Sequence, residues 1–269
     1  MIELFEQDIR TDHRQSSKGN QLKWQNGSTW YKADYTGYEG LAEYLISNLL
    51  RYSNLDADEY VHYNTEEIRY GRRTYLGCES MDFLQPGWQI ITLERLFQNY
   101  YGQGLNKSLY LIENHVSRLK FLVDQTERIT GLKNFGVYMS KLLTVDTLFK
   151  NEDRHTHNIA LLMDTEENYH YCPIFDNGAA LLSDTTLDYP MNMEIRELMD
   201  QVEAKTFCRD FDEQLDIAEK LYGQHIQFRF GEKEVSQLLD TEKHYPNAIK
   251  TRVLDIVLAQ RRKYQYLFR

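Results

Sequence analysis

The sequence contains no apolar run long enough to cross a membrane, which takes about 18 residues or more. Its opening, MIELFEQDIR, also lacks the basic and apolar regions of a secretory signal peptide. From these two absences we expect a cytoplasmic protein that does not act within a membrane.

Cysteine is scarce, and its distribution excludes two classes of small protein. The three cysteines, Cys78, Cys172 and Cys208, are odd in number and widely spaced. They match neither a disulfide framework nor a CxxC zinc motif. A reducing compartment is therefore expected.

Positive charge is also in deficit, because the formal net charge is -10. Such a surface repels phosphate backbones and anionic lipid headgroups, so we expect no direct binding of nucleic acid or membrane. Internal repeats and low-complexity tracts are lacking as well. With 269 residues, the chain can form one large domain or two small lobes.

The first 84 residues have the pattern of a small β-rich lobe. The segment QLKWQNGSTWYK places Asn26-Gly27 between two alternating runs, which predicts a hairpin with strands at 21–24 and 29–32. A polar loop, QSSKGN at 15–20, precedes the hairpin. A helix with an apolar face is predicted over 38–50, followed by a short buried strand in TYLGCES.

Beyond Pro86 the pattern becomes mainly helical. Apolar residues recur at three- and four-residue spacings, which predicts helices at 107–123, 132–149, 195–205, 212–222 and 247–264. We therefore expect an α+β protein with a β-rich lobe at 1–84 that includes one helix, and a larger helical lobe at 85–269.

Eight consecutive residues without an apolar side chain, NEDRHTHN at 151–158, interrupt this apolar sequence. Asp153 and Asn158 lie five residues apart, and Asp176 follows Asn158 by 18 residues. Between them, IALLMD and HYCPIF are predicted to form two buried strands joined by the turn TEENY. Such a hairpin would return Asp176 to Asn158, and their oxygens are the ligands that Mg²⁺ prefers.

These residue types match the needs of phosphoryl transfer. The reaction needs a carboxylate to orient the attacking hydroxyl, a metal on the phosphates and a cation for the other phosphates. The protein-kinase template has its catalytic Asp and metal-binding Asn at the same five-residue spacing. Lys32 could supply the cation, with Glu39 or Glu43 on the next helix holding it, and QSSKGN covering the phosphates.

The motif DRHTHNIALL followed by PIFDNG resembles the catalytic segment of HipA-like kinases and, more distantly, of phosphatidylinositol kinases, which share a D-R-H-x-x-N loop. GNQLKW resembles the G-x-Q-x-K stretch of HipA-like proteins, TWYKAD their lysine strand, and YEGLAEYL their E-x-x-A-x-x-L helix. The resemblance covers about residues 16–184, and the chain length matches the compact CtkA- or HipT-like members. It implies a bilobal protein-kinase-like fold.

By this resemblance Asp153 is the catalytic base, Asn158 and Asp176 hold Mg²⁺, and Lys32 contacts the phosphates of ATP. The helix motif favours Glu39 over Glu43 as the partner of Lys32. His155 has two roles open to it, a share in catalysis or orientation of the loop, and Arg154 braces the loop.

The resemblance also assigns two nucleotide-binding segments. The loop over the phosphates contains Ser16, Ser17, Lys18 and Gly19, and the backbone that receives adenine spans Ser80, Met81, Asp82 and Phe83. Trp30 should share a face with Lys32, so that either it stacks on the base or the predicted strand register is wrong by one residue.

The function implied is that of an ATP- and Mg²⁺-dependent Ser/Thr protein kinase that autophosphorylates Ser16 or Ser17. HipA-like toxins act on translation components and have a neutralising antitoxin, whereas CtkA-like members are secreted effectors. Two alternatives stay open: a lipid or small-molecule kinase, and a non-catalytic kinase-fold binding module. The presence of Lys32, Asp153, Asn158 and Asp176 together argues against the module.

Overall fold

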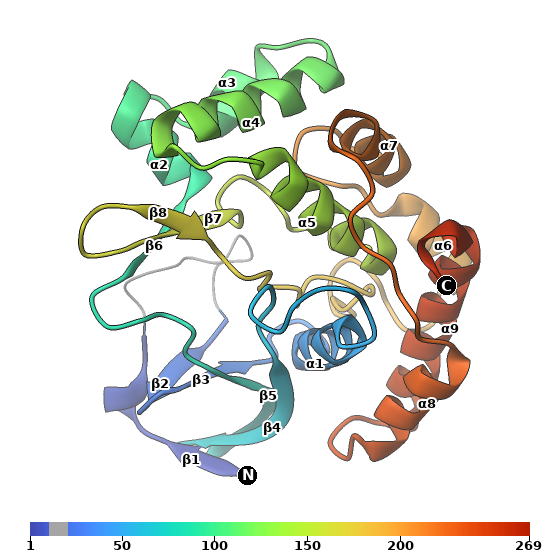
Figure 1. The fold of residues 1–269 in the computed structure, drawn as a ribbon. Coiled ribbons are helices and arrows are strands. Elements are labelled where there is room, and N and C mark those ends of the chain that lie inside the picture. Colours follow the sequence, from blue (N-terminus) through green and yellow to red (C-terminus); the bar gives the residue numbers. More distant parts are fainter. Residues whose placement is uncertain (11–20) are drawn as a thin grey trace. The chain divides into compact units, whose positions relative to one another are not determined.

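The computed structural model describes residues 1–10 and 21–269 (Figure 1). The chain divides into two compact units. Unit 1 comprises Met1–Phe83, Phe175–Val202 and Gln227–Arg269, and unit 2 comprises Leu84–Ile174 and Glu203–Ile226. Unit 1 thus includes two late segments of the chain. The expected lobes at 1–84 and 85–269 stay a prediction.

Unit 1 contains a five-stranded sheet in the order β1-β4-β5-β3-β2. Its strands are β1 (Ile2–Leu4), β2 (Lys23–Asn26), β3 (Thr29–Ala33), β4 (Tyr63–Tyr70) and β5 (Arg73–Met81). β1 pairs with β4 in parallel and the other neighbours are antiparallel. One face buries a cluster of apolar side chains, comprising Leu4, Trp24, Tyr31, Ala33 and Ile68.

Lys32 and Trp30 occupy the opposite face of β3, because successive side chains of a strand alternate between faces. Tyr31 and Ala33 belong to the apolar cluster, while Trp30 and Lys32 are half-buried. In the sheet Trp30 lies opposite Ser80, and Lys32 lies opposite Cys78. Trp30 and Lys32 therefore share a face of β3, as predicted, and stacking of Trp30 on a base stays a prediction.

The expected hairpin between β2 and β3 is present, although its turn lies one residue later than predicted. Asn26 pairs with Thr29, so Gly27 and Ser28 form the two-residue turn. Gly27 has φ of +59°, whereas Ser28 does not have a positive φ. A positive φ at the first turn residue alone is the pattern of a type II′ turn, which favours glycine there.

The helix α1 (Glu39–Leu50) packs against β4 and β5 and is buried over most of its length. Gly40 allows this approach, because a Cβ there would lie 2.4 Å from the carbonyl carbon of Gly77. Unit 1 also contains α6 (Ile195–Gln201), α8 (Glu232–Thr241) and α9 (Asn247–Lys263), with 3-10 turns at Glu6–Asp8 and Gln265–Leu267. α8 packs against both α1 and α9.

Unit 2 contains a three-stranded antiparallel sheet of β6 (Gln89–Thr92), β7 (Ala160–Met163) and β8 (Tyr169–Tyr171). The hairpin of β7 and β8 confirms the predicted one, with Leu161 opposite Tyr171. The strand β6 was not predicted. It lies about 70 positions before β7 in the chain and pairs with it.

The helices of unit 2 are α2 (Leu93–Tyr101), α3 (Leu105–Tyr110), α4 (His115–Thr130), α5 (Phe135–Phe149) and α7 (Phe211–Tyr222). The single helix predicted at 107–123 is wrong, because the Asn114 side chain accepts a hydrogen bond from the Ser117 N–H and starts a new helix. α5 is largely buried and packs against α4 and α7. Across the described ranges 1–10 and 21–269, no helix is long and apolar enough to span a membrane.

Candidate active site

The polar segment 151–158 of unit 2 forms a loop, here called the 151–158 loop, that is anchored to the end of α5. Asp146 in the last turn of α5 accepts hydrogen bonds from Arg154 Nε at 3.0 Å and from Asn151 Nδ2 at 3.0 Å. Arg154 and Asp146 are both buried, so losing either partner would leave an unpaired charge in the interior, which is strongly destabilising. Arg154 also donates to the Asn158 carbonyl at 3.0 Å, so it braces both ends of the loop as predicted.

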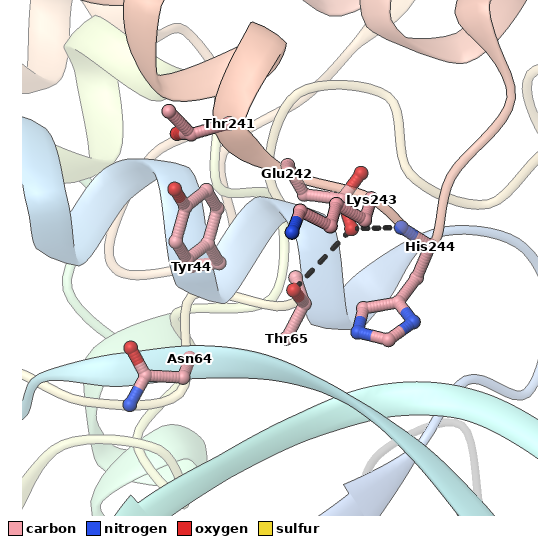
Figure 2. A pocket seen from close by; sticks show the side chains of 7 residues that line it. All are labelled: Tyr44, Asn64, Thr65, Thr241, Glu242, Lys243 and His244. Carbon is pink, nitrogen blue, oxygen red and sulfur yellow. Dashed lines mark hydrogen bonds between the residues drawn. The ribbon is translucent and has the colours of Figure 1, made fainter. Parts of the chain in front are cut away.

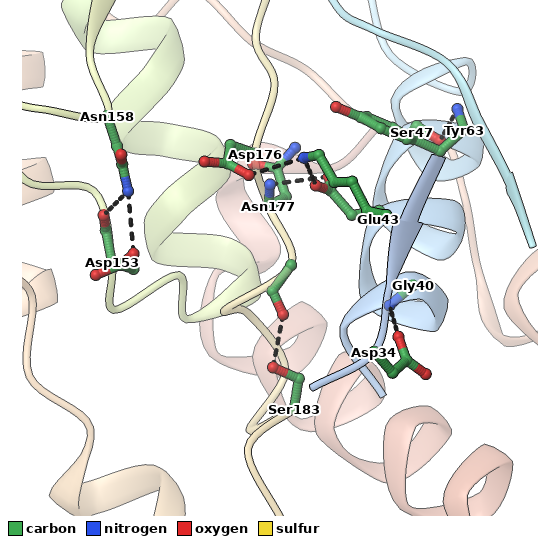
Figure 3. Close-up of polar contacts among 12 residues, drawn as sticks. Asp34, Gly40, Glu43, Ser47, Tyr63, Asp153, Asn158, Asp176, Asn177 and Ser183 are labelled. Atoms are coloured by element: carbon green, nitrogen blue, oxygen red, sulfur yellow. Dashed lines mark hydrogen bonds and ion pairs between the residues drawn. The ribbon is translucent and has the colours of Figure 1, made fainter. Parts of the chain in front are cut away.

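Asp153 and Asn158 meet across the 151–158 loop (Figure 3). The Asn158 amide donates to the carbonyl oxygen of Asp153 at 2.8 Å and to its Oδ2 at 3.0 Å. This leaves Asn158 Oδ1 as the atom that can ligate a metal, and it fixes the Asp153 carboxylate in orientation. The five-residue spacing seen in the sequence therefore corresponds to a direct contact.

His155 lies beside the Asp153 carboxylate, with Nε2 at 3.7 Å from Oδ1. Its Nδ1 accepts a hydrogen bond from the His157 backbone N–H at 3.2 Å, so a neutral ring carries its proton on Nε2, facing Asp153. Burial lowers the pKa of His155, and Asp153 only partly offsets this. A neutral imidazole that points its N–H at Asp153 can orient this carboxylate.

Three charged side chains of unit 1 form what we call the lysine cluster: Lys32 on β3, Glu43 on α1, and Asp176 after β8. Glu43 and Asp176 are labelled in Figure 3. Lys32 Nζ donates to Glu43 Oε1 and to Asp176 Oδ1, each at 2.8 Å. The other Glu43 oxygen accepts from the Asn177 backbone N–H at 2.9 Å. Glu43 thus ties the lysine and the 176–177 backbone to one helix.

Burial and charge act in opposite directions on Lys32. Desolvation lowers the pKa of Lys32, but the carboxylates of Asp176 and Glu43 outweigh it and hold the pKa well above the ordinary value. Lys32 is therefore a fixed cation at neutral pH. Its side chain is 15% exposed, so a ligand can still reach it.

The prediction that Glu39 is the partner of Lys32 was wrong. Glu39 is the first residue of α1, and its carboxylate accepts from the backbone N–H groups of Thr36 at 2.8 Å and Gly37 at 3.1 Å. Glu43 lies one helical turn further along the same face, which brings its carboxylate to Lys32. Glu39 instead fixes the loop that leads into α1.

The start of α1 is held by a second carboxylate, Asp34. Its Oδ1 accepts from the Gly40 N–H at 2.6 Å and its Oδ2 from the Tyr245 hydroxyl at 2.7 Å. Burial and the nearby charge of Glu39 raise the pKa of Asp34 to about 7. Asp34, Asp146 and Tyr245 were not predicted as site residues, because none of them belongs to a sequence motif and Tyr245 contacts Asp34 from far along the chain.

The predicted adenine-binding segment lies at the end of β5. Ser80 is paired with Trp30 and Tyr63, and Met81 is exposed. The Asp82 N–H donates to the Ser28 carbonyl at 2.7 Å, and the Phe83 ring lies 5.8 Å from that of Phe175. The nucleotide-binding role of this segment stays a prediction.

The predicted phosphate loop, with Ser16, Ser17, Lys18 and Gly19, lies outside the described residues. A cavity of about 270 Å³ in unit 1 is a separate feature (Figure 2). It is lined by polar residues of α1, β4, the end of α8 and the segment after α8: Tyr44, Asn64, Thr65, Thr241, Glu242, Lys243 and His244. Among the residues that the structure describes, none of those predicted to bind ATP or metal lines it.

Comparison with solved structures identifies the fold. The structure is similar to that of CtkA, a proinflammatory kinase of Helicobacter pylori, with a TM-score of 0.60 over 97% of this chain and 95% of that chain, at 14% identity. The chain has a CtkA-like fold. The α+β class and the resemblance predicted from the sequence are thereby confirmed at the level of the fold.

A second similarity, to HipA of Shewanella oneidensis in a complex with HipB and operator DNA, has a TM-score of 0.47 and 14% identity. It covers 96% of this chain and 66% of that HipA chain. The sequence matches no protein-family model and no curated protein. The CtkA-like fold therefore rests on structure, and the activity has to be argued from the residues.

Proposed function

We propose that this protein is an ATP- and Mg²⁺-dependent protein kinase that phosphorylates serine or threonine. The observation that carries the proposal is the lysine cluster within a CtkA-like fold, because a half-buried lysine held between two carboxylates has little structural benefit of its own. The 151–158 loop supplies the other part, a carboxylate fixed by an amide and a histidine.

Each residue then has a defined task. Lys32, kept charged by its two partners, binds phosphate oxygens, and Glu43 holds the lysine in position. Asp153 accepts a hydrogen bond from the attacking hydroxyl and takes its proton, while the N–H of neutral His155 orients Asp153. His155 in this proposal is a positioning residue and does not take the proton.

The donor set suits a hard cation. Asp176 presents a carboxylate that is 26% exposed, and Asn158 presents an amide oxygen, and both are ligands that Mg²⁺ accepts. When bound, Mg²⁺ would neutralise charge on the phosphates of ATP. Asp176 would then exchange part of its contact with Lys32 for the metal.

The test is incubation with radiolabelled ATP and Mg²⁺, using wild type, Asp153→Ala and Asp176→Ala on the protein itself and on a generic Ser/Thr substrate. Both variants should lose label by about 100-fold or more, since each removes a group used in the transition state. Matched controls are Asp58→Ala in unit 1 and Asp124→Ala in unit 2, which remove exposed carboxylates and should keep wild-type labelling.

Label that persists in both variants would refute the assignment. ATP-dependent thermal stabilisation without any label transfer would favour the binding module, and transfer to lipid or a small molecule would favour the other alternative. Phosphopeptide mapping of labelled protein would test autophosphorylation at Ser16 or Ser17. A translation component as substrate and an antitoxin as partner stay predictions, as do a cytoplasmic location and an effector role.

A further inference from the structure

Three side chains with different metal-ligating atoms meet in unit 2, and none of them is among the residues used above. They are His115, the first residue of α4, Glu213 in the first turn of α7, and Cys208 in the segment between α6 and α7. One ligand atom of each lies within 4.8 Å of the others. We infer that His115, Cys208 and Glu213 form a binding site for a divalent transition metal of the zinc class.

The chemistry of the donors selects this class of ion. An imidazole, a thiolate and a carboxylate are the three side chains that bind Zn²⁺, at about 2.0–2.3 Å each. Magnesium and calcium take oxygen ligands and make little use of sulfur. His115 and Glu213 are 34% and 48% exposed, so an ion can enter and a water molecule can complete a tetrahedral set.

The side chains of His115 and Glu213 need only a small adjustment to share an ion. His115 Nδ1 lies 2.7 Å from Glu213 Oε1, a hydrogen-bond distance. Two ligands on one tetrahedral ion stand roughly 3.3 Å apart, as follows from bonds of about 2 Å. Because both side chains are partly exposed, they can move apart to this distance while their hydrogen bond is replaced by two metal bonds.

The backbone beneath each ligand is fixed by its own contacts. Asn114 caps α4 beside His115, and the Asp210 carboxylate accepts from the Glu213 N–H at 2.8 Å. Arg118 donates to the Phe207 carbonyl at 2.9 Å, which holds the residue before Cys208 against α4. Preorganised backbone of this kind lowers the entropy lost on binding an ion.

A metal here would also secure the segment that supports the 151–158 loop. Two residues before Cys208, the Thr206 hydroxyl donates to the Arg154 carbonyl at 2.6 Å, and Lys205 Nζ lies 3.9 Å from Glu152. Fixing Cys208 to α4 and α7 therefore restrains the neighbours of Arg154. We assign the ion a structural role, because none of its ligands belongs to the residues proposed to bind ATP.

Cobalt is the probe that tests the site, since a thiolate ligand gives Co²⁺ a distinct charge-transfer absorption. When chelator-treated wild-type protein is titrated with Co²⁺, this band should grow until one Co²⁺ is bound per protein. The visible bands of tetrahedral cobalt should appear with it. Cys208→Ser should lose the charge-transfer band, and Glu213→Gln and His115→Ala should each weaken binding at least tenfold. Cys172→Ser, which removes another buried thiol of unit 2, is the matched control and should keep the band.

Amide hydrogen exchange supplies a second readout that does not depend on activity. Zn²⁺ should slow exchange in residues 203–210 and 151–154 of wild type, with no change in Cys208→Ser. The inference would be overturned by a wild-type protein without the band, by a band that survives in Cys208→Ser, or by one lost equally in Cys172→Ser. Comparing the metal-free melting of all four variants with wild type separates lost folding from lost ligation.

Discussion

Lys32 is a cation in a site where burial alone would favour the neutral amine. Its charge depends on two carboxylates, and these come from different elements: Glu43 from α1 and Asp176 from the segment after β8. Removing one carboxylate would let desolvation lower the pKa of Lys32, and it would remove one of the contacts that hold the lysine in place. The pair of contacts therefore both charges and positions Lys32.

Glu43→Gln should lower phosphorylation activity by at least about tenfold, which corresponds to about 1.4 kcal/mol of transition-state stabilisation. A glutamine keeps the size of the side chain and can still accept from the Asn177 N–H, but it removes the negative charge beside Lys32. The KM for ATP and kcat of purified variants would measure the effect.

Glu39→Gln is the matched control, since it removes a carboxylate of the same helix that does not contact Lys32. It should weaken the loop before α1 and leave the KM for ATP within about twofold of wild type. A larger effect of Glu39→Gln than of Glu43→Gln on this KM would contradict the assignment.

The difference between Glu39 and Glu43 shows what sequence could and could not predict at this scale. Residues four apart lie on the same helical face, so the apolar spacing predicted that face correctly. It did not decide which of the two glutamates contacts Lys32. The choice depends on where α1 begins and how closely Gly40 lets it approach β5. Those are properties of packing, and the sequence motif does not contain them.

At the scale of elements, Asp34 joins the end of β3 to the start of α1 and to Tyr245 before α9. Its raised pKa has a direct consequence for stability. Between about pH 4 and pH 7 the folded protein holds a proton on Asp34 that the unfolded chain has released. The free energy of unfolding therefore falls as pH rises through this window.

Asp34→Asn should remove this dependence, because an asparagine resembles the protonated acid and does not titrate. Relative to wild type, the variant should gain roughly 3 kcal/mol as pH rises from 4 to 7. Urea unfolding at several pH values, with Asp58→Asn as an exposed control, would measure the difference. Parallel pH profiles for wild type and Asp34→Asn would count against a raised pKa.

Elements defined by local pattern were predictable, and those defined by distant partners were not. The hairpin of β7 and β8 and the buried helix α5 follow from alternation and three- to four-residue spacing. The strand β6 pairs with a segment 70 positions later, so its short sequence QIIT carries no sign of it. The break before α4 was signalled by Asn114, but the apolar spacing across it favoured one continuous helix.

At the scale of the whole molecule, the proposed reaction uses residues from both units. Unit 1 contributes the lysine cluster and unit 2 contributes Asp153 and Asn158, and the chain passes from one to the other between Ile174 and Phe175. Sequence order indicated that these residues belong together, because the kinase template has the same order. It could not indicate that unit 1 also takes up 227–269.

Joint use of the two units can be tested with a non-hydrolysable ATP analogue and Mg²⁺ by amide hydrogen exchange. If both units serve one nucleotide, binding should slow exchange in α1 and β3 and also in the 151–158 loop. The reason is that a ligand bound to both regions makes local unfolding of each region less frequent. Asp176→Asn should reduce protection in both regions together, since the metal would then lose a ligand. Asp153→Asn should leave the protection while abolishing phosphate transfer, which separates binding from chemistry. Protection confined to unit 1, with the 151–158 loop exchanging as in the free protein, would mean that Asp153 and Asn158 do not act on the nucleotide held by Lys32.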